Sequence, residues 1–267
     1  MEAQETFTYM VFWNQLSMTK HIDVDEKQPF LSHLKELRDR MLVCVIAVGI
    51  AFVVTYYFKE KIFALLMEPF IKVMPSKSSF IFTGITEAFV TYFKISVVSA
   101  LFLTLPVLLY EFWGFVSPGL YEKEKRYVLP FIFWGSLCFL AGILFCYLAI
   151  IPFLYKFFVS YSAEFIIPML DLKSYMNLTL KMLTIFGLIF ELPLIAYYLT
   201  KAGIINYKML SSKRRYVVLA IFIVSAMIVT TDAAGLILVA FPLWGLYEVS
   251  IFIAKFFGKK EILNESL

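Results

Sequence analysis

Polar and apolar residues follow one another along the chain in long blocks. Six apolar runs of about 15 to 25 residues are separated by stretches that carry most of the charged residues, and a helix of that length crosses, or nearly crosses, a hydrocarbon core about 30 Å thick. The runs lack the alternation of a membrane β-barrel. The pattern predicts an all-α integral membrane protein with six transmembrane helices. The predicted spans are about 41–58, 95–116, 127–153, 175–200, 216–229 and 236–254.

Three segments between the spans also have recognisable patterns. The amphipathic stretch 29–40 is suited to the bilayer surface, ahead of the first span. The stretch 59–93 mixes charged and apolar residues, so we expect a short helix interrupted at Pro69 over the outer face of the bundle. The last two spans are short and are joined by a tight turn that contains Asp232, which predicts a locally thinned bilayer beside them.

We divide the chain into a flexible N-terminal tail (1–28), a membrane domain (29–260) and a short C-terminal tail (261–267). The N-terminal tail holds an apolar patch of about ten residues, which is too short to span a bilayer and has no basic region before it, so it is not a signal peptide. Two other interpretations stay open: that the patch lies on the bilayer surface, or that translation starts at Met18.

Composition agrees with an integral membrane protein, and the distribution of charge predicts how the chain is oriented in the bilayer. The 267 residues are 61% hydrophobic and 18% aromatic, far outside the range of a soluble domain. Of the 24 lysines and arginines, 16 lie in the two termini and the second and fourth loops, and all five arginines are among them. The positive-inside rule therefore places both termini in the cytoplasm.

Few residues in the chain could support metal or catalytic chemistry. The three cysteines lie inside apolar runs, and the only histidines are His21 and His33, so we expect no disulfide, metal site or imidazole-based active site. The chain has no phosphate-binding loop of the G-x-x-x-x-G-K-[ST] kind. We expect neither a cofactor nor an enzymatic activity.

Two carboxylates are candidates for a functional role. Glu124 follows Pro118 and Gly119 on a short loop between two anchored spans, where it could receive a cation; taken alone, it is also explained as an ordinary surface charge. Glu191 lies inside the fourth span, two residues before Pro193, where an ionised carboxylate is costly. Two interpretations of Glu191 stay open: a neutral acid hydrogen-bonded to a carbonyl near Pro193, or a polar group that faces a water-filled cavity or a partner helix.

Five motifs resemble the TatC family, the receptor subunits of the twin-arginine protein translocase. They occur in family order and span about 28–260, and together they are highly specific. They are HLKELRDR (33–40), EPFIK (68–72), FWGFVSPGLYEKEKR (112–126), FELP (190–193) and FPLWGLYE (241–248).

The resemblance implies a signal-peptide site at the cytoplasmic face. It assigns recognition of the paired arginines of the signal peptide to Glu36, with Arg38 in the same motif, and to Glu124, and it adds the aromatic residue Phe115. Two carboxylates that each accept a planar guanidinium suit such a ligand, and lysine would be a poorer substitute.

The resemblance also implies a setting for this site. It predicts a concave bundle in the cytoplasmic (inner) membrane that acts as receptor and core scaffold for folded precursor proteins. The partners it implies are TatA-like and TatB-like single-span proteins, bound near the intramembrane acid Glu191. It also implies homo-oligomers in a larger complex and export driven by the proton gradient. Pro69 and Asp232 become structural residues of the outer loops. Thr230 and Thr231 stand where the family commonly has prolines, so the geometry of that turn is open.

Two rival functions remain to be weighed. A proton-coupled solute transporter could use Glu191 as its proton carrier, but such transporters usually contain repeats with broken helices, and this sequence shows no internal duplication. An intramembrane protease would need a HExxH pattern or a Ser–His pair at membrane depth, and neither occurs.

Overall fold

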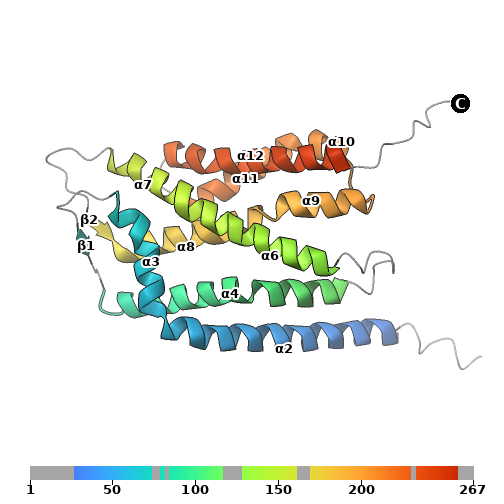
Figure 1. Cartoon of the computed structure of the whole chain (residues 1–267), viewed down its shortest axis with the longest axis horizontal. Coiled ribbons are helices and arrows are strands. Elements are labelled where there is room, and N and C mark those ends of the chain that lie inside the picture. The colour runs from blue at the N-terminus through green and yellow to red at the C-terminus, as the bar shows by residue number, and fades with distance from the viewer. Residues whose placement is uncertain are drawn as a thin grey trace, which may run out of the picture.

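The computed structural model describes residues 27–73, 79–81, 84–116, 128–160, 169–229 and 233–257, and these form a bundle of helices. Figure 1 shows α2 and α4 side by side at one edge of the bundle and α11 with α12 at the opposite edge. The elements are α2 (Lys27–Tyr57), α3 (Lys59–Ile71), β1 (Ser79–Ile81), α4 (Glu87–Val116), α6 (Val128–Phe145), a π-helical turn (Cys146–Ile150), α7 (Ile151–Val159), β2 (Met169–Asp171), α8 (Leu172–Ile189), α9 (Leu192–Lys201), α10 (Tyr207–Ser212), α11 (Arg214–Ile228) and α12 (Ala233–Phe257).

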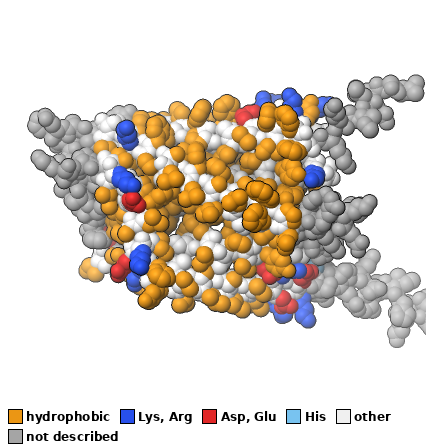
Figure 2. All heavy atoms as spheres, viewed as in Figure 1, with side chains coloured by type: hydrophobic (Ala, Val, Ile, Leu, Met, Phe, Trp, Pro, Cys, Tyr) orange, Lys and Arg blue, Asp and Glu red, His pale blue; other side chains and the backbone are white. Residues whose placement is uncertain are grey.

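Five helical segments of the described chain are long and apolar enough to cross a membrane. They are His33–Tyr57, Glu87–Phe115, Leu129–Val159, Leu172–Lys201 and Ala233–Phe257. Apolar side chains cover the middle of the bundle in the view of Figure 2, and the charged side chains gather at its two ends, as a bilayer-spanning protein requires. The chain is therefore a multi-pass membrane protein.

The two C-terminal helices differ in length. The helix α11 has 15 residues, as short as predicted, and at 1.5 Å per residue it reaches only about 22 Å. The helix α12 has 25 residues and reaches about 37 Å, so the prediction of a short last span was wrong. The helix continues through Gly235 at one end and through Lys255 at the other, beyond both predicted limits.

The first helix also differs from the prediction. The amphipathic stretch 29–40 does not form a separate surface helix, because α2 runs without a break from Lys27 to Tyr57. No proline or glycine occurs between residues 30 and 48 to end the helix. Near its start, the side chain of Arg40 reaches Glu111 at the end of α4, the helix on which α2 packs.

Prolines explain the irregularities of the third and fourth apolar segments. The π-helical turn ends two residues before Pro152, which has no N–H group and crowds the carbonyl four residues earlier; the wider turn makes room for it. The break between α8 and α9 falls at Phe190 and Glu191, just before Pro193, and there the amide of Glu191 donates to the carbonyl of Leu188 at 3.2 Å. Glu191 therefore lies at a joint in the helix.

Hydrogen bonds and a small sheet stabilise the end of the bundle that carries α3. Strands β1 and β2 pair in parallel, with Phe80 opposite Leu170, so the all-α prediction missed a short two-stranded sheet. The Glu87 carboxylate joins the same region, because it accepts hydrogen bonds from the amides of Gly84 at 3.1 Å and Lys173 at 3.0 Å.

The helix α3 passes through Pro69 and ends at Ile71, so the predicted interruption at Pro69 was wrong. Pro69 cannot donate to the carbonyl of Leu65, four residues earlier. The hydroxyl of Tyr147 donates to that carbonyl instead, at 2.7 Å. A side chain of the π-helical turn thus replaces the missing backbone hydrogen bond.

One part of the core lies beneath α3. The rings of Phe70, Tyr155 and Tyr175 pack against one another with centroids 4.9 to 5.1 Å apart, and all three side chains are buried. The hydroxyl of Tyr175 donates to the carbonyl of Leu66 at 2.7 Å. This core fixes one end of the bundle and leaves α2 and α4 to carry the polar residues at the other end.

Candidate functional site

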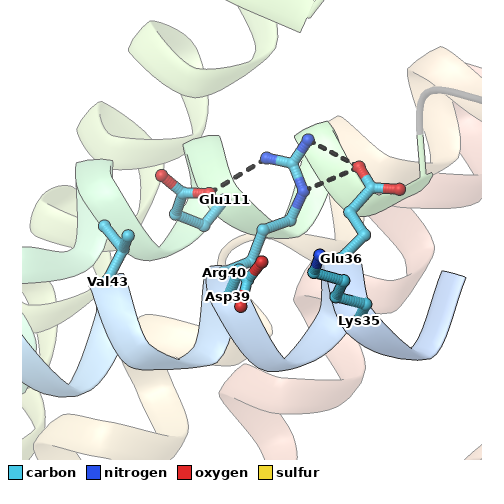
Figure 3. Close-up of a pocket in the computed structure, with 6 residues that line it drawn as sticks. All are labelled: Lys35, Glu36, Asp39, Arg40, Val43 and Glu111. Carbon is cyan, nitrogen blue, oxygen red and sulfur yellow. Dashed lines mark hydrogen bonds and ion pairs between the residues drawn. The ribbon is translucent and has the colours of Figure 1, made fainter. Parts of the chain in front are cut away.

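A guanidinium is held between two carboxylates at the end of the bundle where α2 begins and α4 ends. Arg40 donates to Oε1 of Glu36 through Nε at 3.0 Å and through Nη2 at 2.8 Å, and its Nη1 donates to Oε2 of Glu111 at 3.0 Å. Figure 3 shows the guanidinium lying between the two glutamates, with Glu36 and Arg40 on α2 and Glu111 on α4. Charge-assisted bonds of this geometry are the strong class of hydrogen bond.

This cluster is partly open to solvent. The exposed fractions of the side chains are 28% for Arg40, 33% for Glu36 and 14% for Glu111. A pocket of about 470 Å³ surrounds them and is also lined by Lys35, Asp39 and Val43. A polar group from outside the chain can therefore reach the cluster.

Gly114 allows the guanidinium to approach α4 closely. A Cβ atom at this position would lie 2.7 Å from Cζ of Arg40, which is well inside van der Waals contact. The small residue thus lets Arg40 cross from α2 to the carboxylate of Glu111 on the neighbouring helix.

Phe115, predicted as a site residue, lies beside this cluster. Its ring stacks on the ring of His33, with centroids 4.3 Å apart and an angle of 15° between the planes. Nδ1 of His33 lies 3.7 Å from Oε2 of Glu36, the oxygen that Arg40 does not use. The structure therefore brings Glu36 and Phe115, 79 positions apart, to the two sides of one imidazole.

The other predicted site residues are placed differently. Arg38 is exposed and donates to Oδ1 of its neighbour Asp39 at 2.9 and 2.7 Å, so it makes no contact with the Glu36 cluster. Glu124 and Asp232 lie outside the described residues. Pro69 is buried in α3, close to an exposed ion pair in which Lys72 lies 2.7 Å from Glu68 and lowers the pKa of that carboxylate.

Glu191 is buried, with only 7% of its surface exposed. Neither carboxyl oxygen has a hydrogen-bond partner among the described residues, so the bond to a carbonyl near Pro193, one of the two interpretations of this residue, is not formed there. The carboxyl packs against the backbone of α6, where a Cβ atom on Gly135 would lie 3.2 Å from Oε2. Glu191 is an unsatisfied acid at the joint between α8 and α9.

An apolar groove of about 550 Å³ lies between α6, α9 and α12, and one of its lining residues, Pro193, follows Glu191 by two positions. The walls are aromatic and aliphatic, and Lys201 lies at the end of α9. The lining residues include Trp134, Cys138, Pro193, Tyr197 and Phe257.

Sequence reasoning about the site missed the pairing of Arg40 with Glu111. The only signal for Arg40 was its position four residues after Glu36, which places both on one face of a helix. Glu111 lies 71 residues from Arg40, so only the packing of α2 on α4 reveals the contact. Among the described residues no group of three or more His, Cys, Asp and Glu side chains could hold a metal ion.

The sequence is similar to that of known proteins over most of its length. A family model described as Sec-independent protein translocase protein (TatC) matches residues 32–242. The TatC of Desulforapulum autotrophicum, also described as a Sec-independent protein translocase protein, is 44% identical over 241 residues, which cover 90% of this chain and 89% of that protein. The Escherichia coli K12 protein of the same description is 34% identical over 239 residues, covering 90% and 93%.

The fold is also similar to a solved structure. A crystal structure of the twin arginine translocase receptor TatC superposes with a TM-score of 0.76 at 36% identity, and the match covers 84% of this chain and 98% of that one.

Proposed function

Because the chain belongs to the TatC family of Sec-independent protein translocase proteins, we propose that it is the receptor and core scaffold of a twin-arginine translocase. Family membership makes it a component of a transport system and not an enzyme, and favours this function over the solute transporter and the protease considered above. In this proposal the chain binds the paired arginines of a signal peptide at its cytoplasmic face, and the transmembrane proton gradient drives export of the folded precursor.

The observation that carries the proposal is the guanidinium already bound between Glu36 and Glu111. A site that holds one arginine side chain through carboxylates of two helices has the chemistry to recognise another. We assign the second carboxylate of recognition to Glu124, which follows the end of α4 by eight residues, and we assign to Phe115 contact with the residues beside the arginines.

The orientation and the number of spans are part of this proposal. We place the end where α2 begins and α12 ends in the cytoplasm, which is consistent with the distribution of lysines and arginines. We count α11 as a sixth, short span beside which the bilayer is thinned, in a concave bundle in the inner membrane. The pocket around Arg40 then opens to the compartment that holds the precursor.

The partners are TatA-like and TatB-like single-span proteins, bound in a larger complex that contains several copies of this chain. We place one of their helices along the groove between α6, α9 and α12, next to the joint that carries Glu191. The unsatisfied carboxyl of Glu191 supports a polar contact near this place, because a buried acid without a partner is costly.

Photocrosslinking of a twin-arginine signal peptide to the full chain in membranes tests the receptor function. We expect the crosslink to fall strongly in Glu36→Gln and in Glu124→Gln, and with a peptide in which two lysines replace the arginines. Glu248→Gln is the matched control, since Glu248 also pairs with an arginine, Arg214, at 2.9 Å near the same end of the bundle. An equally strong crosslink in all of these cases would refute the receptor assignment.

A further inference from the structure

We propose that Arg40 is an internal occupant of the binding site for one signal-peptide arginine, that the peptide displaces it, and that Glu111 is a carboxylate of that site. The inference rests on the proposed receptor function. It adds a competing group and a binding residue to that function, neither of which the family resemblance assigned.

The geometry of Arg40 is that of a bound ligand. Three of its N–H groups are engaged, two with Glu36 and one with Glu111, and the contacts of 2.8 to 3.0 Å are ideal for charged pairs. A guanidinium that enters this pocket from a peptide would find its best acceptors already taken. It must therefore either donate to the remaining oxygens or exchange with Arg40.

The remaining carboxylate oxygens form a poorer binding position for a guanidinium than the one that Arg40 fills. In Figure 3 the second oxygen of each glutamate points away from the guanidinium. Oε2 of Glu36 faces His33, and Arg40 reaches Glu111 through Oε2, which leaves Oε1 of that carboxylate unused by the guanidinium. No second position near Arg40 is bridged by carboxylates from both helices, within the described part of the chain.

The charge of the pocket also favours exchange over addition. Its lining holds three carboxylates, on Glu36, Asp39 and Glu111, and two cations, on Lys35 and Arg40, and Asp39 is already paired with Arg38. The remaining charges balance, so one added arginine would leave the pocket positive, whereas a peptide arginine that takes the place of Arg40 leaves its charge unchanged. Arg40 can leave because its side chain is 28% exposed and ends a long flexible stem at the rim.

Exchange gives a physical basis for discrimination between arginine and lysine. A peptide residue must bridge the two carboxylates at least as well as Arg40 does, and an ammonium group lacks the planar fork that makes the bridge. The resident arginine thus excludes weaker cations, because specificity is a difference between competing affinities.

The test is equilibrium binding of a fluorescent peptide with two arginines before an apolar segment, and of its Lys-Lys analogue, to the full chain in lipid nanodiscs. In Arg40→Met we expect the Arg-Arg peptide to bind about tenfold more tightly, and the Lys-Lys peptide to gain more than that. Arg214→Met removes the same charge from another carboxylate near the same end, so it is expected to change binding less than twofold.

Two further variants keep the test decisive. Glu111→Gln is expected to weaken Arg-Arg binding about tenfold in both the wild-type and the Arg40→Met backgrounds, because the peptide itself loses an acceptor. Arg40→Lys retains the charge but not the fork, so an intermediate gain is expected, and this variant decides the question if Arg40→Met does not fold.

Each outcome points to a different conclusion. If the wild-type chain does not prefer Arg-Arg to Lys-Lys, the receptor function itself fails. If it does, but folded Arg40→Met or Arg40→Lys binds the peptide equally or less tightly, Arg40 only positions the glutamates and the displacement is wrong. Unchanged binding in Glu111→Gln would remove Glu111 from the site.

Discussion

Gly142 lies at a close contact between α6 and α8 that sets the position of Glu191. A Cβ atom at this residue would lie 2.7 Å from the carbonyl oxygen of Phe186 and 2.8 Å from Cβ of Phe190. Both are parts of α8 or its end that cannot rotate away, and Glu191 follows Phe190 directly. Small residues at such crossings let membrane helices approach closely. Gly142→Ala must therefore move the two helices apart.

The expected cost follows from these distances. Ordinary contact of a Cβ atom begins near 3.4 Å, so the separation at Gly142 must grow by roughly 0.7 Å, the difference between 3.4 and 2.7 Å. Overpacking of this kind costs about 1–3 kcal/mol in the free energy of unfolding, which for a chain of this size corresponds to a fall in Tm of roughly 3–10 °C.

Thermal unfolding of the purified protein in detergent measures this effect. Gly49→Ala is the matched control, because Gly49 lies inside α2 with nothing within 4 Å of its added Cβ, and alanine is favoured over glycine in a helix by about 0.5–1 kcal/mol. The two substitutions should therefore shift Tm in opposite directions. A Gly142→Ala protein that melts at or above the wild-type temperature would show that the α6–α8 contact is not as tight as described.

Two further predictions concern the end of the bundle near α3. Tyr147→Phe leaves the Leu65 carbonyl without its donor and should lower the free energy of unfolding by about 1 kcal/mol. This loss should largely vanish in a Pro69→Ala background, where residue 69 regains an N–H group. Additive losses in the double-mutant cycle would argue that the Tyr147 hydroxyl does not replace the missing backbone hydrogen bond. The hydrogen bond from Ser174 lowers the pKa of Asp171 below its ordinary value of 3.8, so Asp171 stabilises the fold above that pH and loses this contribution as pH falls through the depressed pKa. Asp171→Asn should therefore lower Tm most at neutral pH, and the loss should shrink steadily as pH is lowered below 3.8; a loss that stays the same at every pH in the same thermal assay would contradict this.

The sequence by itself determined the class of the fold. Long apolar runs that must satisfy their own backbone groups in lipid can form only helices, and the charged stretches between them have to lie outside the hydrocarbon. The joint before Pro193 lies where a proline in a helix leaves a carbonyl open. Glu36 and Phe115 were predicted as site residues by the family resemblance alone, whereas Glu124 was also singled out by its position on a short loop between two spans.

Tertiary contacts decided the features that local patterns could not. The helix α3 continues through Pro69 because Tyr147, from a distant segment, supplies the missing hydrogen bond, and β1 pairs with β2 across about 90 positions of the chain. Neither partner is visible in the local sequence, since a hydrogen bond between segments depends on how the helices between them pack.

The same reason applies to the binding site. Sequence places Glu36 and Arg40 on one face of α2, but only the packing of α2 on α4 brings Glu111 to the far side of the guanidinium, and only the missing side chain of Gly114 lets it come so close. The residue types determine which chemistry is available. The approach of the two helices determines that a single arginine is shared by both carboxylates.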